Sequence, residues 1–300
     1  MKHTIVIMCC CFIFGISCRT EVPYDFPDFE TVPVLNAVFE AGEPMWAHVS
    51  FTNKMENNPL SFCSEALVVL WSNGVVVDTL RYEVEGRYLT DSLATIGKTY
   101  ELQVFVPGHD TIRATQTIPQ PARILHTEHI PLVSRNEEGH MSAFRVTVST
   151  TPGELRYLRF FADGGIGGYA SQYYTEINIK GSQDDPSYIA EGIPFNVVSN
   201  ALFLDDSTCT FQLDFQQGRY YDVYSFYRIY CITVSKDYYE YERSSYIYNE
   251  SRYPEFSFGG VPPYNLYSNT SNGYGIVMAS AREKTDTVRI TNNMSSFAPF

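Results

Sequence analysis

The sequence has 300 residues and a formal net charge of −13, with 34 Asp and Glu against 21 Lys and Arg. So acidic a chain repels nucleic acid and anionic membrane surfaces, and we expect no nucleic-acid partner. The length fits one large domain or two ordinary ones.

The first residues predict a removable export signal. After a short basic start, Ile5–Phe14 is a continuous apolar run, too short to span a bilayer as a helix. Phe14-Gly15-Ile16-Ser17-Cys18 then resembles a lipobox, in which a peptidase cuts before a lipid-bearing Cys, although Leu is usual where Gly15 stands. We therefore expect residues 1–17 to be a lipoprotein signal peptide and Cys18 to carry fatty acyl chains such as palmitate. The alternative is an ordinary signal peptide, with Cys18 a free thiol.

Residues 18–31 predict an extended, lipidated tether, because they contain two prolines and four acids. Two or three acyl chains give a durable anchor, so we expect the outer membrane to hold the protein. The acids Glu21, Asp25, Asp28 and Glu30 resemble the segment that follows Cys in surface-exported lipoproteins, although Arg19 dilutes the match. The cell surface is therefore favoured over the periplasmic face.

Residues 32–121 have the texture of β-structure, with short runs rich in Val, Ile, Thr and aromatics between turn residues. Asn73-Gly74 predicts a tight hairpin, because both residues tolerate positive φ. Six or seven short strands in about ninety residues favour an immunoglobulin-like β-sandwich. Pro119-Gln120-Pro121 then predicts a stiff boundary.

Residues 122–300 predict a second, β-rich C-terminal domain with one short helix, so the whole chain is expected to be mostly β. Phe144–Thr150 and Leu155–Phe161 are expected to be neighbouring strands. Within Asp237–Asn249, tyrosines and a serine recur at steps of three and four, which predicts a short amphipathic helix.

Two cysteines are candidates for a disulfide bond. Cys209 and Cys231 lie in β-rich runs on either side of a turn-like segment, and a hairpin centred near Tyr220 would place them opposite each other. An exported protein meets an oxidising compartment, where such a bond can form. Two small buried side chains are the equal alternative.

Tyrosines crowd one stretch of the second domain, and they are candidates for a contact surface. Tyr combines a flat apolar face with a hydroxyl, which suits glycan, peptide or protein recognition. The alternative is that these rings fill half-buried strands. The residues chosen are Tyr220, Tyr221, Tyr224, Tyr238, Tyr239 and Tyr241.

No catalytic, metal or cofactor site is predicted. His126 and His129 stand three residues apart in extended sequence, which places them on opposite faces of a strand. Gly164–Gly168 lacks the following Lys-Ser/Thr of a phosphate loop. No Ser occupies a nucleophile elbow, and we expect the protein not to be an enzyme.

Several short segments stand out along the chain. They are Pro33–Phe39, Gly97–Val104, Thr117–Pro119, Val234–Tyr239 and, most specifically, Leu266-Tyr267-Ser268-Asn269-Thr270-Ser271-Asn272-Gly273-Tyr274-Gly275-Ile276. Their order and spacing resemble those of a Bacteroidota surface-lipoprotein family catalogued as domain of unknown function 4249. The resemblance implies an immunoglobulin-like domain, a β-rich domain and a gene commonly beside a TonB-dependent transporter.

Together these features predict a non-enzymatic, lipid-anchored outer-membrane protein. We expect it to be accessory to a TonB-dependent outer-membrane transporter in nutrient capture or uptake. The alternatives are a structural or adhesive cell-surface protein and a surface hydrolase, which would need a nucleophile or metal constellation that the sequence does not signal.

Overall fold

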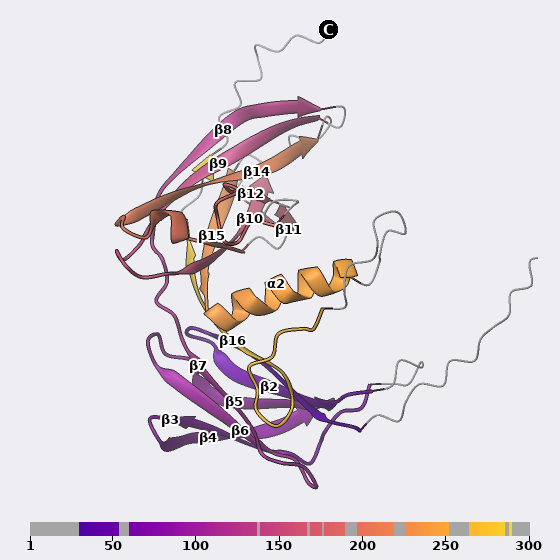
Figure 1. Ribbon diagram of the computed structural model, residues 1–300. Coiled ribbons are helices and arrows are strands. Elements are labelled where there is room, and N and C mark those ends of the chain that lie inside the picture. Colours follow the sequence, from indigo (N-terminus) through magenta and orange to yellow (C-terminus); the bar gives the residue numbers. More distant parts are fainter. Residues whose placement is uncertain are drawn as a thin grey trace, which may run out of the picture. The chain divides into compact units, whose positions relative to one another are not determined.

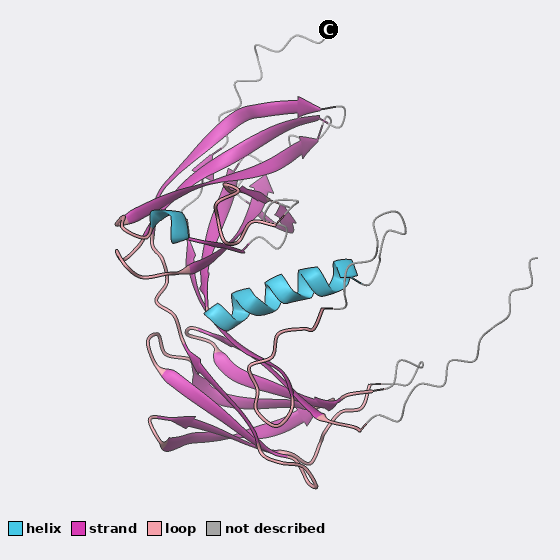
Figure 2. Ribbon diagram, in the orientation of Figure 1, coloured by secondary structure: helices cyan, strands magenta, loops and turns pink. Residues whose placement is uncertain are grey.

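The structure is a computed structural model that describes residues 30–53, 60–136, 139–166, 169–175, 177–189, 197–218, 226–251, 264–285 and 288–289. The signal peptide, Cys18 and most of the tether lie outside this part. Val32–Phe300 forms one compact unit, separate from Met1–Thr31. The described chain is mostly β with one α-helix, as the sequence predicted (Figure 2).

Seven strands make up the first half of the unit. They are β1 (Pro33–Glu40), β2 (Pro44–Phe51), β3 (Leu67–Ser72), β4 (Val75–Val84), β5 (Arg87–Leu93), β6 (Thr99–Phe105) and β7 (Ile112–Thr117). Along β1 every second residue is buried, so Leu35, Ala37 and Phe39 point into one core. The predicted hairpin is confirmed: Asn73 and Gly74 have φ of 51° and 74° and join β3 to β4. The immunoglobulin-like arrangement of these strands stays a prediction.

The second half contains the remaining elements. They are β8 (Ile124–Asn136), β9 (Gly139–Ser149), β10 (Tyr157–Ile166), β11 (Tyr169–Thr175), β12 (Asn178–Lys180), β13 (Val197–Ser199), the 3-10 turn η1 (Ala201–Phe203), β14 (Thr208–Gly218), β15 (Phe226–Val234), the helix α2 (Lys236–Ser251), β16 (Tyr274–Lys284) and β17 (Val288–Arg289). The helix confirms the one predicted over Asp237–Asn249.

Two sheets enclose the core of the second half (Figure 1). Strands β12-β14-β9-β8 form the smaller sheet, and β10 and β15 belong to the larger one. Aromatic rings fill the space between them. Phe144 stacks on Phe215 with ring centres 4.7 Å apart, and Phe160 meets Phe211 at 5.4 Å.

One expected pairing is wrong, and the hairpin on which a Cys209–Cys231 bond depended does not form. Strand β9 pairs with β8 and β14, not with β10, and β14 does not form a hairpin with β15. In both cases the two strands belong to different sheets.

Cys209 and Cys231 therefore sit in different sheets, and both are buried in the core between them. Both are free thiols in the structure. Burial raises the pKa of Cys209 to about 12 and raises that of Cys231 as well, so both thiols are held protonated. A bond between them stays a prediction.

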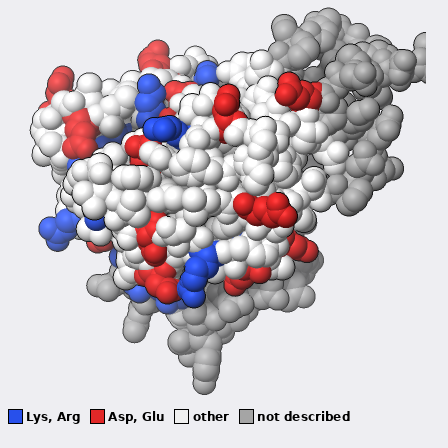
Figure 3. Space-filling view, turned by 90° about the horizontal axis from the view of Figure 1, so that it is seen from below, with Lys and Arg blue, Asp and Glu red and all other residues white. Residues whose placement is uncertain are grey.

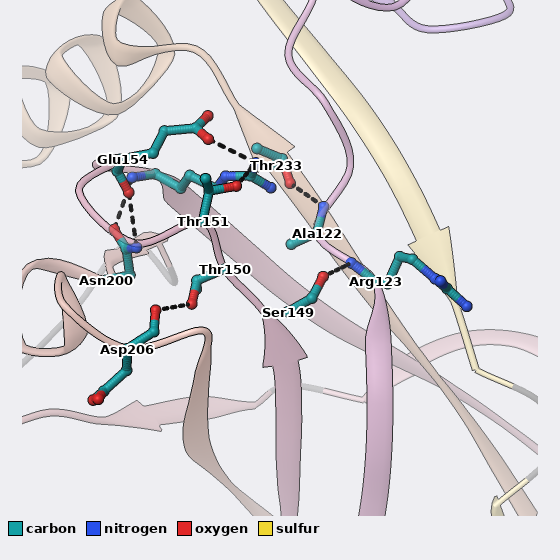
Figure 4. A network of polar contacts seen from close by, with 10 residues as sticks. Ala122, Arg123, Ser149, Thr150, Thr151, Glu154, Asn200, Asp206 and Thr233 are labelled. Atoms are coloured by element: carbon teal, nitrogen blue, oxygen red, sulfur yellow. Dashed lines mark hydrogen bonds and ion pairs between the residues drawn. The ribbon is translucent and has the colours of Figure 1, made fainter.

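The larger sheet runs through both halves because β16 joins them. One edge of β16 pairs with β15, and the other pairs in parallel with β1, matching Asn36 with Ile276. Val277 and Ala279 of β16 belong to the first core. The chain between the two cores is held by its backbone: Ala122 N donates to Thr233 Oγ1 over 2.8 Å, and Arg123 N donates to Ser149 Oγ over 2.9 Å (Figure 4).

Candidate functional site

Helix α2 begins at a serine that also holds it to the sheet. Ser235 Oγ accepts the N–H of Tyr238 at 3.2 Å, which is an N-cap hydrogen bond. The same oxygen accepts the N–H of Ala279 at 3.2 Å, and Ser235 N donates to Ala279 O over 2.8 Å. The start of the helix is therefore fixed against β16.

Two of the predicted contact tyrosines hold the helix in place. Tyr239 is 5% exposed, its ring stacks on Tyr157 at 4.5 Å, and its hydroxyl donates to Pro186 O over 3.2 Å. Tyr238 accepts a hydrogen bond from the Arg159 guanidinium, and burial raises its pKa. Tyr239 thus serves the core, the second of the roles that the sequence left open.

Asp237, in the first turn of α2, accepts hydrogen bonds from two side chains that are distant from it in the sequence. Asp237 accepts the amide of Gln116, from β7, through one oxygen and the hydroxyl of Tyr267 through the other. Tyr267 N in turn donates to Ser244 Oγ over 2.9 Å. Burial, followed by the bond to Asp237, raises the pKa of Tyr267, so its hydroxyl remains a donor.

The segment that follows the helix, Leu266–Ile276, is shaped by its own side chains. Asn269 pairs with the backbone of buried Val277, accepting its N–H at 2.9 Å and donating to its carbonyl over 2.8 Å. Asn272 adopts a φ of 56° and donates to Thr111 O over 3.0 Å. The side chains of Asn269 and Asn272 thus fix the part of the segment before β16, which begins at Tyr274.

Between this segment, α2 and the β1–β16 pair lies a pocket of about 500 Å³, which we call the tyrosine groove. Such a volume is usual for a small-molecule site, for which about 300–1,000 Å³ is typical. Its lining comprises Val34, Asn36, Tyr241, Tyr248, Asn265, Leu266, Tyr267, Ser268, Tyr274 and Gly275. Of the predicted tyrosines it includes Tyr241, whereas Tyr220, Tyr221 and Tyr224 lie outside the described residues.

Some polar groups of the groove are hydrogen-bonded within the chain, and others are open, which means that they have no partner among the described residues. Asn36 Oδ1 accepts the N–H of Ile276 at 3.2 Å, whereas Asn36 Nδ2 has no partner among the described residues. The hydroxyls of Tyr241 and Tyr274 likewise meet no partner within that part of the chain, and Tyr274 is 58% exposed. The groove therefore presents aromatic faces together with open neutral donors and acceptors.

Sequence reasoning missed Asn36, Tyr267 and Tyr274 as site residues. The last two lie in the segment Leu266–Ile276, which carries the resemblance noted above, so a signal was present. Asn36 lies in Pro33–Phe39, another of those segments, but its place in the site could not be inferred, because only the parallel pairing of β1 with β16 brings it beside residues about 240 positions later.

A second cavity, of about 390 Å³, lies where β7, β10, β15 and the start of α2 meet. Two of the charged side chains in its lining are paired with each other: Arg156 Nη2 donates to Glu154 over 2.9 Å, and Asn200 Nδ2 donates to the Glu154 carbonyl over 3.0 Å (Figure 4). Arg156 Nε is buried without a hydrogen-bond partner among the described residues. Asp237, at its edge, is occupied as described above. Hydrogen bonds within the chain therefore engage much, though not all, of the polar lining of this cavity.

Elsewhere, charged side chains of both signs are interspersed with uncharged surface, as the face in Figure 3 shows. Ion pairs such as Arg282–Glu40, at 2.6 Å, neutralise them locally. Within the described ranges, no three His, Cys, Asp or Glu side chains gather as metal ligands. His126 is exposed, whereas His129 packs against Phe144 and Phe215. The described helices include none that is both long and apolar enough for a membrane span.

The chain matches the profile of a known protein family. The sequence profile of the family described as Domain of unknown function (DUF4249) matches residues 19–286. Among curated proteins, none matches the chain.

Proposed function

Because the chain belongs to the DUF4249 family, whose profile spans almost all of it beyond Cys18, we propose a function built on export and binding. The protein is a non-enzymatic lipoprotein, anchored in the outer membrane through Cys18 and facing the cell surface. It works beside a TonB-dependent transporter and helps to capture or admit a nutrient.

The observation that carries this proposal is the N-terminal sequence. An apolar run of signal-peptide length ends in Phe14–Cys18, and a polar, acidic tether follows at once. The match to the family begins at residue 19, directly after the expected cleavage and lipidation site.

The lining of the tyrosine groove supports binding rather than turnover. As far as the structure describes it, the lining consists of tyrosines, amides, a serine and aliphatic side chains, without a carboxylate, imidazole or thiol. General acid–base catalysis uses such groups most often, and a serine nucleophile such as Ser268 needs an adjacent base to activate it. Recognition needs only shape, aromatic surface and hydrogen bonds.

Labelled palmitate tests the anchor. Cys18→Ala should abolish incorporation of the label and release the protein from the membrane fraction. Cys11→Ala, within the segment to be removed, is the matched control and should leave both unchanged. A Cys18→Ala protein that remained labelled and membrane-bound would refute the lipid anchor, and protease shaving of intact cells would test its outward orientation.

Extraction in gentle detergent tests the transporter. Two proteins in one membrane need only modest intrinsic affinity, because tethering raises their effective concentration. An affinity-tagged protein should therefore recover one TonB-dependent barrel in near-equal amount, identified by mass spectrometry. If it emerges alone while a known transporter pair survives the same extraction, the adhesive alternative replaces the transport proposal. Turnover of a peptide or glycan library would instead favour the hydrolase.

A further inference from the structure

The tyrosine groove is held open by contacts that involve no ligand. Tyr267, on one wall, is fixed at its backbone by Ser244 and at its hydroxyl by Asp237. Asn269 locks the same segment onto β16. A groove that is already shaped avoids much of the ordering cost that weakens binding by a flexible site.

The floor of the groove contains a residue without a side chain. Gly275 has a φ of 116°, and an added Cβ would lie 2.0 Å from Leu35 O. Backbone therefore forms this part of the lining, beside the rings of Tyr267 and Tyr274.

The described lining carries no charged side chain, and it offers both apolar faces and hydrogen-bonding groups. Tyrosines come from α2, from the segment after it and from β16, and each offers a flat apolar face. The open polar groups are an amide donor on Asn36 and the hydroxyls of Tyr241 and Tyr274. An ionic ligand would lose its hydration without meeting an opposite charge in this lining.

From this arrangement we infer that the tyrosine groove is a binding site for a neutral saccharide. A sugar ring has an apolar face of C–H groups that stacks on an aromatic ring, and its edge carries neutral hydroxyls that both donate and accept. Asn36 Nδ2 donates to such a hydroxyl, and the Tyr241 and Tyr274 hydroxyls complete the contacts. The inference deepens the proposed function by naming the class of nutrient, and it rests on that function for its biological setting alone.

The test is calorimetric titration of the purified full chain with a fixed panel of probes. The panel contains four neutral disaccharides (maltose, cellobiose, lactose and N,N′-diacetylchitobiose), an anionic sugar (glucuronate) and decaproline, a peptide that aromatic grooves also accept. At least one neutral disaccharide should bind with a dissociation constant of about 1 mM or lower. Glucuronate and decaproline should bind at least tenfold more weakly. Tenfold corresponds to about 1.4 kcal/mol, roughly the loss of one favourable contact with the groove.

Three variants locate the binding. Tyr274→Ala removes an exposed ring and should weaken binding roughly fivefold to tenfold, the effect of about one aromatic contact. Asn36→Asp keeps the acceptor for Ile276 N but replaces the open donor, and should weaken binding by a similar factor. Tyr82→Ala is the matched control: Tyr82 is 46% exposed on β4, outside the groove, and its loss should change binding less than about twofold.

Each outcome decides the inference. It is overturned if no neutral disaccharide binds, if decaproline or glucuronate binds more tightly, or if Tyr274→Ala and Asn36→Asp bind as the unmodified protein does. Far-ultraviolet circular dichroism of every variant identifies a folding defect, and Tyr241→Phe, which removes only a hydroxyl, then replaces a variant that fails to fold. Loss of saccharide binding with the barrel still recovered refutes the ligand class and leaves the transport proposal standing. Saccharide binding without recovery of a barrel refutes the transport proposal and leaves the ligand class standing.

Discussion

Gly275→Ala should be among the most damaging single substitutions in the described chain. Gly275 stands opposite Leu35 in the parallel β1–β16 pair, and an alanine Cβ would lie 2.0 Å from Leu35 O and 2.7 Å from Leu35 C. Both are backbone atoms, so no side chain can move aside and the strands must separate. A strained φ alone costs about 1–3 kcal/mol. With the lost pairing, the total should exceed about 4 kcal/mol, a large share of the roughly 5–15 kcal/mol that stabilises an ordinary domain.

Chemical denaturation measures this loss as a lower midpoint at unchanged slope. Gly42→Ala is the control, because Gly42 also has a positive φ, of 83°, but an added Cβ there meets nothing within 4 Å. It should cost about 1–2 kcal/mol, the penalty of a left-handed backbone by itself. Equal losses for the two variants would refute the argument that close approach of β1 to β16 requires glycine at position 275.

Three further substitutions test individual contacts. Asn269→Ala leaves the N–H and carbonyl of buried Val277 without their side-chain partner and should lower the free energy of unfolding by about 1–3 kcal/mol in denaturant titrations. Ser235→Ala removes the N-cap bond to Tyr238 and the bond from the N–H of buried Ala279, and should cost about 1–3 kcal/mol, whereas Ser235→Thr should retain most of both. Burial lowers the pKa of His129 below its usual 6.5, so the unfolded chain takes up a proton that the folded protein resists. The contribution of His129 to stability is therefore complete above about pH 6.5 and should decline as the pH falls below it, and His129→Phe should flatten that decline in the same titrations.

Local signals in the sequence predicted local structure well. Asn73-Gly74 specifies a turn with two positive φ angles, and the three- and four-residue steps of Asp237–Asn249 specify a helix. Each signal depends on residues within one or two turns of chain. For the same reason the mostly β composition could be inferred from runs of Val, Ile, Thr and aromatic residues.

Which strands pair could not be inferred in the same way. Adjacent β-runs suggested that β9 pairs with β10 and β14 with β15, but each pair is divided between two sheets. The residues that connect two strands are of the same types whether the second strand joins the same sheet or the opposite one, so they do not reveal which strands pair. The parallel pairing of β1 with β16 is harder still, because it depends on the packing of both cores and no turn sets its register.

The same limit explains why the candidate site was only partly predicted. Tyr241 was chosen because it stands in a tyrosine-rich stretch, but the groove that gives it a role exists only once β1 and β16 are paired. Asn36 shows the point most clearly, since in isolation it is a single amide in an alternating strand. Its chemistry becomes visible when its oxygen is found engaged by Ile276 N and its nitrogen open beside the tyrosine rings.

The segment Leu266–Ile276 joins scaffold and site in one short stretch of sequence. Asn269, Asn272 and Gly275 are occupied with backbone: they pair with Val277, reach Thr111 and allow the approach of Leu35. Tyr267 and Tyr274, interleaved with them, present rings to the groove. Changes at the first group should therefore alter stability before they alter binding. The side chain of Tyr274 is exposed and its hydroxyl has no partner in the described chain, so a substitution there can change binding at little structural cost. If the groove determines ligand choice, position 274 is where a different ligand is accommodated while the fold is retained.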